Sequence, residues 1–348
     1  MNNNAILLPE WANQSAIQLT WPHEGTDWRE YLDDICATYA EMADAITRYE
    51  KLLVVAPEPE LVKKELSKRL TSCQLDNIIF HKCPTNDTWA RDHGFITLGG
   101  DGTYTLLDFR FNGWGDKFEA ALDNAINRSL YDNGVVEGTY TDLNSFVLEG
   151  GSIESDGRGT VLTTSQCLLA PHRNQPLTRS EIEQKLKSML HAERILWIDY
   201  GHLEGDDTDG HIDTLVRIAP DDTLLYIGCD DKSDSHYDDL KRMEEQLKTF
   251  RTADGKPYRL MRLPMPAAIY DDGDRLPATY ANYVIVNGAV IYPTYNQPDN
   301  DAEVERVIKA AFPGRDVIGI DSRTVIRQHG SLHCCTMQLY SKITEQKQ

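Results

Sequence analysis

The sequence predicts an α/β protein built from repeated units of two strands, a helix and a third strand. The unit is clearest between residues 283 and 320, and the same pattern occurs just before it, between residues 214 and 263. Both stretches join short apolar runs, typical of strands, to a longer segment of helical periodicity. Together with a third stretch before them, they indicate an internal repeat of about 50 to 70 residues, for which a ring of units is a plausible arrangement. The alternative is a generic α/β domain in which this spacing is coincidental.

The first predicted element is a helix over residues 28 to 48. Its apolar positions recur at three- and four-residue steps: Trp28, Leu32, Ile35, Tyr39, Met42 and Ile46. This spacing places them on one buried face of a helix. The apolar run at residues 52 to 55 then predicts a buried strand.

A second helix is predicted to begin at Ser180. Ser180 and Glu183 have the Ser-x-x-Glu spacing of a capping box, in which each side chain bonds the backbone N–H of the other residue. Ile182, Leu186 and Met189 would then face inward, and residues 195 to 198 predict the strand that follows.

The two clearest units come next in the chain. The first has predicted strands near 214 to 218 and 224 to 227, a helix near 237 to 250 and a strand near 258 to 263. The second has strands at 283 to 286 and 289 to 292, a helix at 301 to 312 and a strand at 317 to 320. Asn287-Gly288 joins the second pair of strands, and this dipeptide favours a tight hairpin turn because both residues tolerate positive φ angles.

Length and composition predict one globular domain, residues 1–348. With 348 residues, 41% of them hydrophobic, the chain can bury a substantial core without disulfides or metals. No linker or low-complexity tract divides it. A net charge of −20 argues against nucleic acid or an anionic membrane as a partner, and it allows a cationic ligand. The charge can equally serve solubility alone, and a homo-oligomer is left open.

The cysteines predict a protein of a reducing compartment. There are seven, an odd number without a C-x-x-C pair, so a disulfide framework or a zinc ribbon is not indicated. Met1 to Asn4 lack the basic start of a signal peptide, and no run of about 18 apolar residues follows. We therefore expect a cytoplasmic protein in which any special cysteine is catalytic.

Five polar segments recur at or just before the first strand of successive units. They are centred on Asp92, Glu149, His211, Asn282 and Cys334, at intervals of 57, 62, 71 and 52 residues. Units arranged around an axis would bring these five places together. The pattern therefore predicts one central site.

His211 and Asp213 are predicted to lie two apart on a strand, which would point both side chains to the same face. Histidine can transfer a proton near neutral pH, and a neighbouring carboxylate can hold a cation or orient the imidazole ring. The alternatives are a surface pair, or half of a metal site completed by His329, His333 and Cys334. That set lacks the paired spacing of a structural zinc motif, so we predict no metal and no organic cofactor.

Cys334 lies between His333 and Cys335, shortly after Gly330. Free cysteines are commonly small buried hydrophobic residues, and this is the alternative for both Cys334 and Cys335. In an extended segment only one of the two can face the site.

Considered together, the motifs resemble the agmatine deiminase family of guanidine-modifying enzymes over nearly the whole chain. The matching segments are Leu-Pro-Glu-Trp at 8 to 11, Thr-Trp-Pro-His at 20 to 23, Asn-Asp-Thr-Trp-Ala-Arg-Asp at 86 to 92, Phe-Asn-Gly-Trp-Gly at 111 to 115, Leu-Glu-Gly-Gly-Ser-Ile-Glu at 148 to 154, His-Ile-Asp at 211 to 213, Leu-Pro-Ala-Thr-Tyr-Ala-Asn at 276 to 282 and His-Cys-Cys-Thr at 333 to 336. Two segments depart from the family pattern: His329 to Leu332 at the pocket rim, and Glu154, where histidine is common.

The resemblance implies a five-bladed α/β propeller, or pentein, of ββαβ units with pseudo-five-fold symmetry, its last blade completed by the N-terminal segment. It also implies roles for residues at matching positions. Cys334 is the nucleophile, His211 the acid and base, and Asp92 and Asp213 hold the guanidinium. The remaining expected pocket residues are Glu149, Trp89, Asn282 and Trp114.

The expected activity is hydrolysis of agmatine to N-carbamoylputrescine and ammonia, a step of putrescine and polyamine biosynthesis, through a covalent thiouronium on Cys334. We expect the bound cation and a protonated His211 to lower the thiol pKa. Deimination of peptidyl-arginine or another guanidino compound is the nearest alternative, and free arginine is another. A non-catalytic binder of polyamine-like cations is the alternative from a different class.

Overall fold

Five sheets in the computed structural model, which describes residues 5–345, share one strand arrangement. In each, an antiparallel pair of strands is followed by a parallel neighbour. The first three sheets are β1 (Ile6–Leu7), β5 (Ile96–Gly100), β6 (Thr103–Arg110) and β7 (Thr139–Val147); β8 (Ile153–Ser155), β9 (Thr160–Thr164) and β10 (Arg194–Ile198); and β11 (Val216–Ala219), β12 (Thr223–Gly228) and β13 (Arg259–Pro264).

The last two sheets complete the repeat. They are β16 (Val284–Val286), β17 (Ala289–Thr294) and β18 (Asp316–Asp321), and β19 (Thr336–Leu339), β2 (Ala16–Thr20), β3 (Lys51–Ala56) and β4 (Ile78–Lys82). The expected closure by the N-terminal segment is confirmed, because β19 near the end of the chain pairs antiparallel with β2, Thr336 opposite Leu19. A small ribbon of β14 (Tyr270–Asp271) and β15 (Asp274–Arg275) lies outside the repeat.

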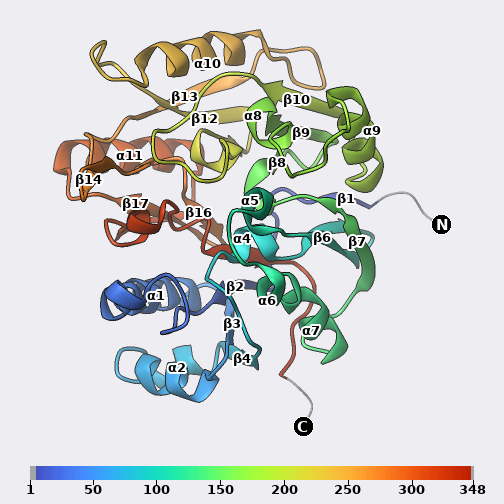
Figure 1. Cartoon of the computed structure of the whole chain (residues 1–348), viewed down its shortest axis with the longest axis vertical. Helices are drawn as coiled ribbons and strands as arrows, with labels where there is room; N and C mark the ends of the chain where they lie inside the picture. The colour runs from blue at the N-terminus through green and yellow to red at the C-terminus, as the bar shows by residue number, and fades with distance from the viewer. Residues whose placement is uncertain (1–4, 346–348) are drawn as a thin grey trace.

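Helices surround the sheets. Figure 1 shows α1 (Leu32–Thr47), α2 (Pro59–Leu66), α7 (Ile126–Asp132), α9 (Arg179–Met189), α10 (Tyr237–Thr249) and α11 (Pro298–Ala311) at the outside of the molecule. The short α4 (Ala90–His93) and α5 (Gly113–Asp116) lie near its centre. The other short helices are α3 (Ser72–Leu75), α6 (Ala121–Asn124), α8 (Ser165–Leu168), η1 (Arg29–Tyr31), η2 (Gly150–Ser152), η3 (Ile212–Thr214) and η4 (Val325–Gln328).

The core is formed where each long helix packs on its sheet. On α1, Ile35, Tyr39 and Ile46 are fully buried, in the same hydrophobic cluster as Leu52 and Val54 of β3. Burial of each such side chain stabilises the fold by about 1.5–3 kcal/mol. The helical periodicity read from residues 28 to 48 is thus confirmed, although Trp28 lies before the helix.

Several local predictions are wrong in detail. The cap of α9 is Thr178, whose hydroxyl accepts from the N–H of Glu181 in a capping box, so Ser180 lies within the helix. The observed cap lies two residues before the predicted one, because Thr178 and Glu181 have the same capping-box spacing as Ser180 and Glu183. In the β16–β17 hairpin only Gly288 has a positive φ, 80°.

The strand predicted at 214 to 218 begins at Val216, and His211 and Asp213 are not on a strand. They flank Ile212 at the start of the 3₁₀ helix η3. The α/β class is confirmed, and two strands, a helix and a closing strand recur as predicted in the units ending at β13 and β18.

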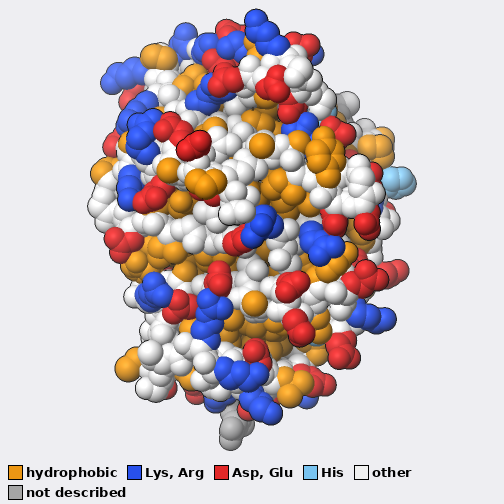
Figure 2. Space-filling view, turned by 90° about the vertical axis from the view of Figure 1, so that its left-hand side faces the viewer, with side chains coloured by type: hydrophobic (Ala, Val, Ile, Leu, Met, Phe, Trp, Pro, Cys, Tyr) orange, Lys and Arg blue, Asp and Glu red, His pale blue; other side chains and the backbone are white. Residues whose placement is uncertain are grey.

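The surface has no single-sign patch on the face shown in Figure 2, where acidic and basic side chains are interspersed with hydrophobic ones. Among residues 5–345, no helix combines the length and apolar character that crossing a membrane requires. Met1 to Asn4, on which the expected absence of a signal peptide depends, lie outside the described range.

Candidate active site

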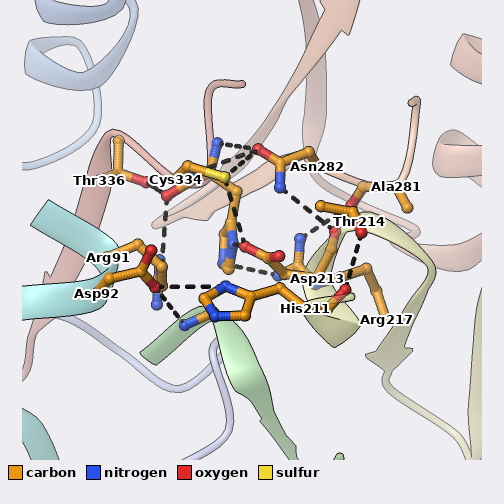
Figure 3. A network of polar contacts seen from close by, with 12 residues as sticks. Arg91, Asp92, His211, Asp213, Thr214, Arg217, Ala281, Asn282, Cys334 and Thr336 are labelled. Carbon is orange, nitrogen blue, oxygen red and sulfur yellow. Dashed lines mark hydrogen bonds and ion pairs between the residues drawn. The ribbon is translucent and has the colours of Figure 1, made fainter. Parts of the chain in front are cut away.

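The five polar segments each lie just before the strand that begins a unit. Asp92 precedes β5, Glu149 precedes β8, His211 precedes β11, Asn282 precedes β16 and Cys334 precedes β19. Figure 3 shows Asp92, His211, Asp213, Asn282 and Cys334 converging from these segments. The recurrence noted in the sequence thus marks equivalent places in the five sheets.

Cys334 faces an amide and a carboxylate. Its Sγ lies 3.4 Å from Asn282 Oδ1 and 3.8 Å from Asp213 Oδ2. Asn282 Oδ1 also accepts the backbone N–H groups of His333 and Cys334, at 3.0 and 3.2 Å. Asn282 therefore fixes the turn that carries the thiol, and it does not line the open pocket.

Asp92, Asp213 and His211 come together beside Gly151. Asp92 Oδ1 lies 3.7 Å from His211 Nδ1, and neither ring nitrogen of His211 has a hydrogen-bond partner among the described residues. Asp213 Oδ1 is likewise buried without a partner there. Buried polar atoms are normally satisfied, so these free atoms indicate the place of a polar ligand.

Gly151 makes this convergence possible. A Cβ atom at that position would lie 2.6 Å from His211 Nδ1 and 2.9 Å from Asp92 Oδ1, closer than side chains approach. Its N–H donates to Asp92 Oδ1 at 3.0 Å. Only glycine allows the backbone to come this near to both side chains.

The buried charges perturb one another. Burial, with the nearby charges of Asp213 and Glu149, raises the pKa of Asp92 to about 6, although His211 acts in the opposite direction. Burial alone would lower the pKa of His211, but the Asp92 carboxylate raises it well above its usual value. The pair therefore favours an imidazolium beside a carboxylate near neutral pH.

The thiol behaves differently from the prediction. Burial, followed by the negative charges of Asp213 and Asp92, raises the pKa of Cys334 well above its usual value. The expected lowering by His211 is not found, because burial and then the two carboxylates favour the neutral thiol. A bound guanidinium would neutralise those carboxylates, so the thiolate should form when the substrate arrives.

Alkylation tests this coupling between cation and thiol. Labelling of Cys334 by neutral iodoacetamide should be slow at pH 7 and should keep rising past pH 8.5, without an early plateau, because the thiolate is scarce. A cationic haloacetamidine should label Cys334 at least tenfold faster at the same pH. The exposed Cys73 is an internal reference, for which the two reagents should show no such preference. A labelling plateau for Cys334 below pH 7 would contradict this account.

Glu149 lies close to His211 and contacts Arg173, a residue that the sequence did not single out. Its Oε1 accepts from Arg173 Nε at 2.8 Å, and Arg173 Nη1 also contacts Asp209 Oδ2 at 2.5 Å. Both Glu149 and Arg173 have fully buried side chains. Glu149 and His211, with Cys167, are close enough to hold a metal ion, as are Glu10, Glu154 and His333.

Trp89 and Trp114 line the pocket, as predicted for both. Trp114 Nε1 donates to Asp92 Oδ2 at 3.0 Å, and Trp89 Nε1 donates to Asp87 Oδ2 at 3.1 Å. Trp114 adopts the left-handed region, φ 57°, between Gly113 and Gly115, which also have positive φ. Left-handed backbone costs a non-glycine residue about 1–2 kcal/mol, which the buried bond to Asp92 can offset.

Behind Asp213 lies a buried charge network that sequence reasoning missed. His333 Nδ1 is 2.7 Å from Asp213 Oδ2, and His333 Nε2 is 2.7 Å from Glu10 Oε1. Arg217 contacts Glu10 and Glu154 and is fully buried. The network holds Asp213 in place, and its hydrogen bonds and charges lower the Asp213 pKa against the opposing effect of burial. In the sequence, the one sign of this network was that Glu10 and Glu154 lie inside the motifs at 8 to 11 and 148 to 154.

The pocket mouth is acidic. Its lining includes Asp27, Asp87 and Asp207, and no lysine or arginine is found among its described lining residues. Asp87 Oδ1 is buried without a hydrogen-bond partner in the described part of the chain. Burial and the neighbouring charge of Asp27 raise the pKa of Asp87 to about 7. The mouth can therefore accept a second positive charge.

Known proteins resemble this chain in sequence and in fold. A sequence model of the Porphyromonas-type peptidyl-arginine deiminase family matches residues 6–339. An agmatine deiminase of Medicago truncatula is 30% identical over 94% of each chain.

Solved structures extend the likeness. The structure of a C. jejuni agmatine deiminase, a cysteine-to-serine variant with substrate bound, is 39% identical with a TM-score of 0.89, covering 98% of this chain and 97% of that one. The structure of a Porphyromonas gingivalis protein provisionally named an arginine deiminase is 49% identical with a TM-score of 0.92, covering 98% and 100%.

Proposed function

This chain belongs to the family of Porphyromonas-type peptidyl-arginine deiminases, and we propose that it hydrolyses agmatine to N-carbamoylputrescine and ammonia. One observation carries the proposal. The buried thiol of Cys334 lies beside Asp213, and Asp92 lies beside His211. Cys334 and Asp92 line a pocket together with the further carboxylates Asp27, Asp87 and Asp207. Such a site suits a molecule with a guanidinium at one end and an ammonium at the other.

Asp92 and Asp213 hold the guanidinium. A guanidinium is planar and cationic, and carboxylates bind it by charge-assisted hydrogen bonds that fix its plane. Asp213 offers the free Oδ1, while each Asp92 oxygen already accepts one N–H and retains a second lone pair. Held in this way, the central carbon of the guanidinium faces the Cys334 sulfur.

Two chemical steps follow. As the cation binds, the Cys334 thiol loses its proton to solvent. The thiolate attacks the central carbon, and the tetrahedral adduct expels ammonia as the imidazolium of His211 protonates the departing nitrogen. The remaining thiouronium is attacked by water, from which His211, now neutral, removes a proton. Collapse of this second adduct breaks the C–S bond, releases the ureido product and restores the thiol. The agmatine deiminase of C. jejuni, crystallised with substrate as a cysteine-to-serine variant, supports a cysteine nucleophile.

The acidic mouth favours agmatine over free arginine. Arginine carries a carboxylate near its amino group, which Asp27, Asp87 and Asp207 would repel, and the described lining residues include no lysine or arginine to bind it. Agmatine lacks that carboxylate and presents only an ammonium. Peptidyl-arginine also lacks a free carboxylate, but it supplies no cation for Asp87.

Asp87→Asn tests this assignment of the mouth. The variant keeps an oxygen acceptor for Trp89 Nε1 but loses the charge. We expect the KM for agmatine to rise about tenfold, equivalent to about 1.4 kcal/mol, with a smaller change in kcat. Asp132→Asn, on the surface helix α7, is the matched control and should leave KM unchanged.

The pH dependence gives a second readout. The Asp87 pKa is raised to about 7, and an ammonium binds its ionised form. In the wild type, KM for agmatine should therefore rise as pH falls through about 7, and in Asp87→Asn this part of the profile should be absent. An unchanged KM and an unchanged profile in the variant would contradict an ammonium site at Asp87.

A substrate panel tests the function itself. Purified protein is incubated separately with agmatine, free arginine and an arginine-containing peptide, and ammonia is measured beside the product mass. Conversion of agmatine with the highest kcat/KM is the expected result. A higher kcat/KM for the peptide or for arginine would assign that compound as the substrate instead of agmatine. If none of the three compounds were converted, the deiminase function would be contradicted.

We extend the proposal to the architecture and setting of the enzyme. The five equivalent sheets support a five-bladed α/β propeller with pseudo-five-fold symmetry, formed by residues 1–348 as a single catalytic domain. The seven free cysteines favour a reducing, cytoplasmic location, where agmatine hydrolysis would supply putrescine for polyamine biosynthesis. The proposed partner is a small cationic guanidino compound, not nucleic acid, and a homo-oligomer is compatible with the chain.

A further inference from the structure

A second sulfur lies beside His211, away from the nucleophile. Cys167 is in α8, directly after β9, and its Sγ, one nitrogen of His211 and one oxygen of Glu149 all lie within 4.8 Å of one another. All three side chains are fully buried. The catalytic cycle proposed above uses neither Cys167 nor the oxygen of Glu149 that faces away from Arg173.

The donor atoms of this cluster are poorly satisfied. Glu149 Oε2 and both nitrogens of His211 lack a hydrogen bond of ordinary geometry among the described residues, and within the cluster the Cys167 thiol contacts the His211 ring. A buried carboxylate oxygen left without a partner is costly, and its presence points to a ligand. Thiolate sulfur, imidazole nitrogen and carboxylate oxygen are the three donor types that zinc combines in proteins.

We propose that Glu149, Cys167 and His211 form a site for Zn²⁺ that switches the enzyme off. Three protein ligands leave the fourth tetrahedral position to water, and one sulfur and one nitrogen donor favour Zn²⁺ over Ca²⁺ or Mg²⁺, which prefer oxygen. Binding exchanges protons of Cys167 and His211 for the metal, because the ligands coordinate in their deprotonated forms.

The surrounding charges permit a dication here. Arg173 contacts Glu149 Oε1, but Asp209 offsets its charge at 2.5 Å. Asp92, 3.7 Å from His211, adds negative charge close to the cluster. The second group of potential ligands, Glu10, Glu154 and His333, is a poor site, because Arg217 already contacts all three.

The functional consequence rests on the proposed deiminase reaction. A metal on His211 takes the lone pair that the ring needs to accept a proton from water, and it prevents the ring from donating one to ammonia. Zinc should therefore inhibit at stoichiometric occupancy, and removal of zinc by a chelator should restore the rate.

Metal binding is measured first, independently of activity. Chelator-treated full-length protein is dialysed against Zn²⁺, and bound metal is counted for the wild type and for Cys334→Ser, Cys167→Ser and Cys335→Ser. We expect one zinc per chain in all but Cys167→Ser, whose affinity should be at least tenfold weaker. With Co²⁺ as a probe, the thiolate-to-metal absorption band should persist in Cys334→Ser and disappear in Cys167→Ser.

The controls separate the site from its alternatives. Cys335 is a buried cysteine outside the cluster, so Cys335→Ser tests whether loss of any buried thiol has the same effect. Circular dichroism establishes that Cys167→Ser is folded. Zinc retained by Cys167→Ser but lost by Cys334→Ser would place the metal on the nucleophile and overturn the proposal, as would the absence of stoichiometric binding. Binding without agmatine turnover would support the metal site while refuting the proposed function.

Discussion

Replacement of Cys334 by serine is expected to reduce agmatine turnover by on the order of 10⁴-fold or more while the protein stays folded. A serine hydroxyl is a far weaker nucleophile than a thiolate, and a bound cation cannot ionise it near neutral pH. Cys334 is 4% exposed, and its sulfur lies near Asn282 Oδ1 and Asp213 Oδ2. An oxygen can occupy that place, so thermal unfolding should shift little.

Cys335→Ser is the matched control for this prediction. Cys335 is adjacent in the chain but packs in the core that includes Tyr39, and burial raises its pKa to about 12. The variant should lose some stability because a hydroxyl replaces a buried thiol, yet its kcat should remain within about threefold of the wild type. Loss of turnover in Cys335→Ser with full turnover in Cys334→Ser would reverse the assignment.

Asp213→Asn and Asp92→Asn should each lower kcat/KM by about 10³-fold, equivalent to about 4 kcal/mol. Each substitution keeps the shape of the side chain but removes one of the two negative charges that hold the guanidinium and promote its attack. The wild-type rate should also fall as pH drops through about 6, where Asp92 becomes protonated. Steady-state kinetics over a pH range, beside thermal melts, measure both effects.

Asp108→Asn controls for the general cost of losing a buried carboxylate. Asp108 is 2% exposed and accepts hydrogen bonds from Tyr140 and Asn127, outside the pocket. Its substitution should lower the melting temperature and leave kcat/KM nearly unchanged. If Asp92→Asn and Asp213→Asn changed the melting temperature but not the rate, the two carboxylates would be structural.

Local patterns were sufficient to predict much of the fold. The periodicity of α1, α10 and α11 and the apolar runs of β12, β17 and β18 correspond to elements in the structure within a few residues. The predicted start of a helix was wrong where two neighbouring residues could each form a capping box, as with Thr178 and Ser180, which are each followed three residues later by a glutamate. The strand prediction at His211 was wrong for another reason. The residues after His211 form a 3₁₀ helix, and His211 packs beside Gly151 and Asp92, a contact that no local sequence pattern encodes.

The site was predictable as far as its residues occur in recognisable motifs. Asp92 lies beside His211, Cys334 lies beside Asp213, and Trp89 and Trp114 line the pocket, while the roles assigned to these residues stay predictions. The network of Glu10, Arg217 and His333 was missed, because these residues are far apart in sequence and meet only after β19 closes on the N-terminal sheet.

The protonation state of the thiol was also beyond the sequence. Burial of Cys334 and the proximity of two carboxylates outweigh His211, and both are consequences of packing. Because the thiol is neutral before the substrate binds, the charge of the substrate is needed to ionise it. In this account the guanidinium is at once the electrophile and the charge that generates the nucleophile.

The most direct measurement is to trap the covalent intermediate. Wild-type enzyme is mixed with excess agmatine, quenched in acid during turnover, digested and analysed by mass spectrometry. We expect a peptide containing Cys334 whose mass is increased by that of agmatine less one ammonia, with the added mass on Cys334. Turnover of agmatine without any such adduct, or with the adduct on Cys335 or Cys167, would contradict it.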